Sequence, residues 1–170
     1  MKTTAGVFNT QLEAESALAE LMRAGVPKTD ISYLHLSNGK VVNDTTGASV
    51  GDKAAKGAAT GTALGVLAGL AVVNGVLPGL GTLIVAGPIA ASLGLTGAAA
   101  TTAAAAATGL AAGGLVGALT GYGISQNDAS TYEQLVKKGN SLLIVKTSNP
   151  IAVKTILLQH GAKEVREYTA

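Results

Sequence analysis

Two parts of the chain alternate hydrophobic and polar positions with the periods of strands and helices. In the first part, this pattern predicts strands over Ala5–Phe8 and Ile31–Leu36, joined by an amphipathic helix over Gln11–Ala24 that ends at Gly25. We expect the inner side of that helix to be apolar and to carry Leu12, Ala17, Leu18, Leu21 and Met22. We expect its outer side to be charged and to carry Glu13, Glu15, Glu20 and Arg23.

The second such part lies at the other end of the chain and repeats the pattern. It predicts a helix over Asp128–Lys138, a strand over Ser141–Lys146, a helix from Asn149-Pro150 to His160, and a strand over Glu164–Thr169. The two parts align as two βαβ units. They predict an α+β fold with a ferredoxin-like split βαβ domain, in which two helices back a four-stranded antiparallel sheet, and the helix from Asp128 is a return link.

Between these parts lies a stretch of 71 residues, Gly57 to Asn127, that contains no Lys, Arg, Asp or Glu; we call it the uncharged block. Within it, two sets of glycines recur every four residues and would each form a stripe on a helix. These glycines are Gly57, Gly61, Gly65, Gly69, Gly109, Gly113, Gly117 and Gly121. Since Gly costs about 1 kcal/mol relative to Ala in a helix, we expect close helix packing or oligomerisation at these stripes to offset that cost.

The uncharged block therefore predicts a long Ala/Gly-rich apolar α-helical hairpin, a pair of glycine zippers that interrupts the ferredoxin-like domain. Leu77-Pro78-Gly79 and Gly87-Pro88 interrupt it, with Leu80–Ala86 as a short tip or re-entrant turn and Pro88 at the start of a further helix. The predicted division of the chain is 1–52 for the first half-domain and a polar linker, 53–127 for the hairpin, and 128–170 for the return helix and second half. A flexible low-complexity tract is the alternative.

The length of the block fits two membrane crossings with a re-entrant piece, or three short ones, at about 20 residues per crossing. Because both flanks must reach one domain, we expect an even number of crossings. Lysines flank the block (Lys53, Lys56, Lys137 and Lys138) and place the domain on the cytoplasmic side of the cytoplasmic membrane. Tyr122 is the one aromatic residue of the block, so the interfacial aromatic belt is missing, which favours a cytoplasmic assembly as the alternative.

Composition excludes several kinds of chemistry. With no Cys there is no thiolate metal site and no cysteine nucleophile, and 12 basic against 10 acidic residues give a net charge of only +2, which argues against nucleic-acid binding. The two histidines, His35 on a strand and His160 at a helix end, lack neighbouring ligands at metal-binding spacing. No phosphate-binding loop is present. We therefore predict no enzyme activity, no cofactor, no metal and no small-molecule substrate.

Several segments of both flanks resemble the bacterial general stress proteins, the heat- or low-temperature-induced group, and so does the glycine-zipper insert. In the first part these are Gly6-Val7-Phe8-Asn9-Thr10, Glu13-Ala14-Glu15, Ala17-Leu18, Leu21, Ala24-Gly25-Val26 and Asp30-Ile31-Ser32. In the second they are Tyr132-Glu133, Val136-Lys137-Lys138-Gly139, Leu142 to Val145 and His160-Gly161-Ala162. The resemblance implies a stress-linked role and transfers no catalytic residue.

Together these observations predict a non-enzymatic stress-response protein that self-associates through its glycine stripes, with the hairpin inserted in a membrane. One alternative is a soluble self-assembling particle or filament whose apolar hairpins are buried between subunits. Another is a small-ligand sensor that uses the open face of the sheet, which rests on fold analogy.

Overall fold

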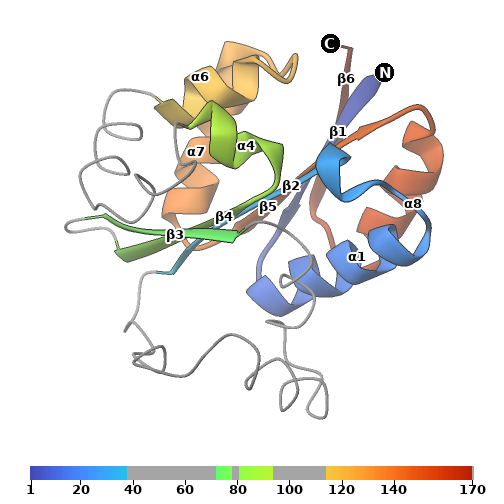
Figure 1. Cartoon of the computed structure of the whole chain (residues 1–170), viewed down its shortest axis with the longest axis horizontal. Coiled ribbons are helices and arrows are strands. Elements are labelled where there is room, and N and C mark those ends of the chain that lie inside the picture. The colour runs from blue at the N-terminus through green and yellow to red at the C-terminus, as the bar shows by residue number, and fades with distance from the viewer. Residues whose placement is uncertain (38–71, 78–80, 94–113, 170) are drawn as a thin grey trace.

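The computed structural model describes residues 1–37, 72–77, 81–93 and 114–169, and these form one antiparallel sheet with helices on both faces (Figure 1). The sheet has six strands in the order β3-β4-β2-β5-β1-β6. Helices α1 (Gln11–Arg23) and α8 (Pro150–Gln159) cover one face, and α4 (Pro88–Ser92), α6 (Gly114–Thr120) and α7 (Gln126–Lys137) lie on the other. The α+β class and the antiparallel sheet with its helices are as predicted.

The two flanks supply the four strands β1 (Lys2–Phe8), β2 (Ile31–Ser37), β5 (Ser141–Thr147) and β6 (Glu164–Thr169). A short 3-10 helix, η1 (Lys28–Asp30), precedes β2. Strand β5 lies between β1 and β2, and β1 lies between β5 and β6, so each flank's strands enclose one strand of the other flank. The predicted elements of the flanks are confirmed, with bounds that shift by three residues at most.

Helix α1 is positioned by local signals at both ends. Thr10 and Glu13 form a capping box, in which the Thr10 hydroxyl accepts from the Glu13 amide and the Thr10 amide donates to the Glu13 carboxylate, both at 3.3 Å. Gly25 has φ +83° just after the helix, a left-handed conformation that glycine adopts without strain. These signals turn the chain from β1 into α1 and then back toward β2.

The predicted inner and outer sides of α1 were partly wrong. Leu12 is 63 % exposed, whereas Glu15 is 2 % exposed and lies among the buried residues Ala14 and Leu18. The reason is that Ala14, Ala17, Leu18 and Leu21 define the buried stripe. At about 100° per residue Glu15 borders this stripe, whereas Leu12 falls on the opposite side of the helix. The buried position of Glu15 creates a polar cluster under the helix.

Within the described part of the uncharged block, the predicted helical hairpin is wrong at residues 72–77 and 81–86, whereas α4 and α6 are helical as predicted. Instead of helix or tip, residues 72–77 and 81–86 form strands β3 (Val72–Leu77) and β4 (Gly81–Ala86), an antiparallel pair that joins the sheet at β2. Val and Ile at these positions favour extended backbone over helix. The boundary at 52 and 53 lies outside the described residues, and the boundary at 127 falls within α7.

Pro88 begins helix α4, as predicted from its fixed φ and missing donor. The turn before it brings the chain against β2. Gly87 has φ +84°, and a Cβ there would lie 2.0 Å from the Ile31 carbonyl oxygen. The Ile89 amide donates to the Ser32 hydroxyl at 3.3 Å in a buried setting. This part of the uncharged block is therefore packed directly on the strand that follows α1.

Two buried cores lie on opposite faces of the sheet. The core beneath α1 and α8 includes Phe8, Leu18 and Tyr33, all fully buried. The core beneath α4, α6 and α7 includes Leu34, Leu119 and Ile144. Since α4, α6 and α7 cover this second face, the open face that the ligand-sensor alternative requires is covered in the described structure.

Candidate functional site

The predicted glycine stripes are described at two of their eight positions. Gly57, Gly61, Gly65, Gly69, Gly109 and Gly113 lie outside the described residues. Gly117 lies in α6 and Gly121 directly after it, and both are exposed. A Cβ added at Gly117 would meet nothing within 4 Å, and one at Gly121 would meet carbonyl oxygens of residues 118 and 117 on its own helix. Within the described structure, no second helix packs on these two glycines, so the surface at Gly117 has room for an added side chain.

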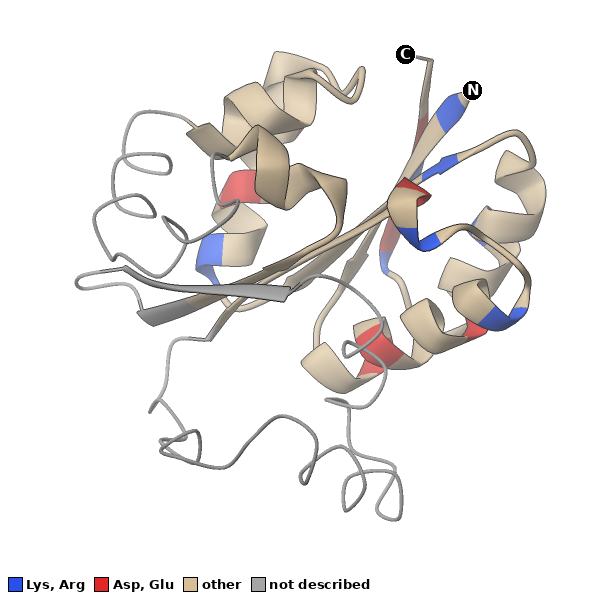
Figure 2. Ribbon diagram, in the orientation of Figure 1, with Lys and Arg blue, Asp and Glu red and all other residues tan. Residues whose placement is uncertain are grey.

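The charged residues and the uncharged block occupy different parts of the fold. Figure 2 shows Lys, Arg, Asp and Glu on α1, α7 and β6 and in the neighbouring loops, and none on α4 or α6. The sequences of β3 and β4 contain none either. The two edges of the sheet differ in the same way. Strand β6 carries Glu164, Arg166 and Glu167, and Lys2 of β1 lies 3.8 Å from the carboxylate of Glu167. Strand β3 at the other edge has the sequence VVNGVL. One edge is thus charged and the other is not.

A buried polar cluster under α1 was missed from the sequence. Glu15 accepts a 2.7 Å hydrogen bond from the Gln11 side chain through one carboxylate oxygen, and its other oxygen has no hydrogen-bond partner among the described residues. Next to the core beneath α1 and α8, His35 Nδ1 lies 3.0 Å from the hydroxyl of Ser141. The tautomer of His35 decides which atom donates. The sequence predicted Glu15 on the solvent side of its helix, and its buried place beside the core beneath α1 and α8 corrects that prediction.

Burial controls the ionisation of this cluster. It raises the pKa of the Glu15 carboxyl, against the opposing effect of the Gln11 hydrogen bond, and it lowers the pKa of His35. Burial also raises the pKa of the Tyr33 phenol. Each shift favours the neutral form. Ser141 is fully buried and His35 is 8 % exposed, so the Ser–His pair has no described access to a substrate and serves the packing of β2 on β5.

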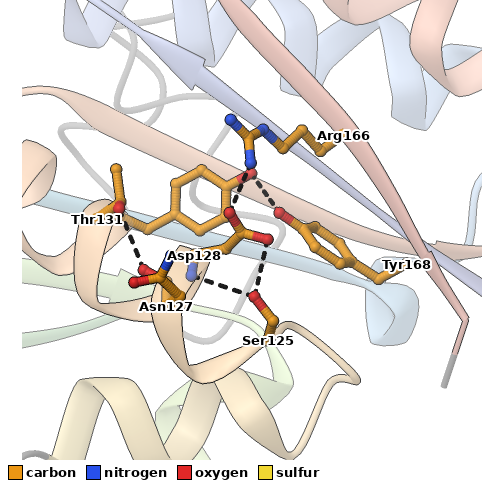
Figure 3. Close-up of polar contacts among 7 residues, drawn as sticks. Ser125, Asn127, Asp128, Thr131, Arg166 and Tyr168 are labelled. Atoms are coloured by element: carbon orange, nitrogen blue, oxygen red, sulfur yellow. Dashed lines mark hydrogen bonds and ion pairs between the residues drawn. The ribbon is translucent and has the colours of Figure 1, made fainter.

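A second polar network joins α7 to the edge strand β6 (Figure 3). The Ser125 hydroxyl accepts from the Asp128 amide as the cap of α7 and donates to the Asp128 carboxylate at 2.9 Å. The other oxygen of that carboxylate accepts from Arg166 at 2.5 Å, across 38 residues of sequence. The arrangement ties the start of α7 to β6 by an ion pair that is itself held by the helix cap.

Beside this ion pair, the hydroxyls of Tyr132 and Tyr168 lie 2.8 Å apart (Figure 3). Tyr132 is buried at 1 % exposure, and burial raises its pKa. Burial raises the pKa of Tyr168 as well, although this residue is only half-buried. Both phenols therefore stay neutral at physiological pH and act as hydrogen-bonding groups.

A cleft of about 400 Å³ lies between the end of α1 and the start of α8. Its lining mixes apolar residues such as Pro27 and Ile156 with the polar residues Lys146 and Asn149. Two of these polar groups have partners in the fold: Asn149 accepts from the Ala152 amide as the cap of α8, and the Lys146 ammonium lies 4.4 Å from the ring centre of Tyr122.

Three remaining predictions concern the histidine at a helix end, metal ligands and membrane-spanning helices. His160 is the C-cap residue of α8, as expected from its place at a helix end. In the described parts of the chain, no three residues among His, Asp and Glu come together in a way that could hold a metal ion. Of the helices described, none is both long enough and apolar enough to span a bilayer.

Comparisons of the chain with protein-family models, with curated proteins and with solved structures found no match.

Proposed function

We propose that this protein is non-enzymatic and acts by self-association, and that its subunits join through the uncharged block. The observation that carries the proposal is the absence of any charged side chain from Gly57 to Asn127, in a segment that reaches the surface at α6. Surfaces of soluble monomers normally carry both signs of charge throughout. An uncharged, largely apolar segment of this length is typical of one that is covered by other protein or by lipid.

The flanks supply the scaffold for this association. We propose that β1, α1, β2, β5, α8 and β6 form a ferredoxin-like domain, and this is supported by the strand order β2-β5-β1-β6 and by the two helices on one face. The β3–β4 pair extends the sheet beyond β2. The subunits that associate would then each contain an extended sheet, one edge of which is uncharged.

The test uses Gly117, because its surroundings separate folding from assembly. Gly117→Leu adds a side chain where nothing lies within 4 Å, so the sheet should fold as before while any subunit contact at this surface is disturbed. We expect light scattering to show a smaller assembly for Gly117→Leu than for the wild type. The matched control is Gln134→Leu on the exposed side of α7, outside the block, and it should leave the assembly size unchanged. An unchanged size for Gly117→Leu counts against association at this surface.

Insertion of the block into the cytoplasmic membrane is the second candidate. It is favoured by two uncharged runs, residues 57–71 and 94–113. Both runs lie outside the described residues. Alkaline extraction of membranes from cells that express the untagged chain distinguishes the two. Retention in the bilayer supports membrane insertion, and release as a large species supports a cytoplasmic assembly.

We include in this proposal the stress-linked role that the resemblance implies. It predicts that the protein accumulates after a heat or cold shift. Quantitative immunoblotting before and after each shift tests it, and constant levels under both would contradict it.

A further inference from the structure

We draw no further inference here: the strongest candidate, the cleft of about 400 Å³ between the end of α1 and the start of α8, carries nothing because the described part of the chain does not show what occupies or covers it.

Discussion

Replacing Gly87 by alanine tests whether the β3–β4 part of the uncharged block is packed on the sheet. Gly87 joins β4 to α4 with φ +84° and ψ −166°, a region that is almost restricted to glycine. An added Cβ would lie 2.0 Å from the Ile31 carbonyl oxygen and 3.0 Å from the Cα of Ser32. Both contacts are with backbone of β2, which cannot move without disturbing the centre of the sheet.

The expected loss of stability has two parts. The backbone conformation costs about 1–3 kcal/mol for a residue other than glycine. The overlap with Ile31 forces β4 and α4 away from β2 and disturbs the buried hydrogen bond from the Ile89 amide to Ser32. We expect Gly87→Ala to lower the free energy of unfolding by about 3 kcal/mol or more. At a urea dependence of about 2 kcal/mol per M, the midpoint would fall by about 1.5 M.

Two control variants separate the causes. Gly25→Ala has a similar φ of +83° but open space around the added Cβ, so it should show the conformational cost alone. Gly117→Ala has ordinary helical backbone and open space, so it should stabilise α6 by up to about 1 kcal/mol. If the free energy of unfolding of Gly87→Ala lies within about 1 kcal/mol of the wild-type value, β4 and α4 do not pack on β2 as described. The same conclusion follows if Gly87→Ala loses no more stability than Gly25→Ala.

Three further predictions use urea unfolding as well. Glu15→Gln keeps the contact with Gln11 and removes a buried charge, so it should be more stable than the wild type at pH 7. Because burial raises the folded pKa of Glu15, the wild type regains stability as pH falls through that pKa, and a gap that stays constant with pH would contradict this. Tyr168→Phe should cost about 1–3 kcal/mol because it leaves the buried Tyr132 hydroxyl unpaired, and Tyr132→Phe should cost about 1 kcal/mol; the reverse order would refute the assignment. Thr10→Ala should cost about 1 kcal/mol through loss of the α1 cap, and no measurable loss would show that the cap is dispensable.

The sequence predicted the flanks well because their signals are local. Period-two and period-3.6 patterns, a capping threonine, and glycines after α1 and α8 mark each element, and the structure confirms them. The inner side of α1 could be predicted only in part. A buried glutamate contradicts the rule that charges face water, and the Gln11 contact that accommodates Glu15 is visible only once the helix is placed on the sheet.

The prediction failed at residues 72–77 and 81–86 of the uncharged block because uncharged, Gly-rich sequence fits both a membrane helix and a sheet strand. The glycine spacing dominated that interpretation, although Val72, Val73, Leu83, Ile84 and Val85 carry a strand signal on either side of Pro78-Gly79. In the sequence, two β-rich runs separated by Pro-Gly are a pattern that predicts a hairpin. Their pairing with β2 is a long-range contact that local pattern does not specify.

Sedimentation equilibrium of the full chain without detergent, over two orders of magnitude in concentration, tests the central claim most directly. Self-association through the uncharged block predicts a mass that rises with concentration to a multiple of the 16.7 kDa chain. A single species of 16.7 kDa at every concentration would contradict the account.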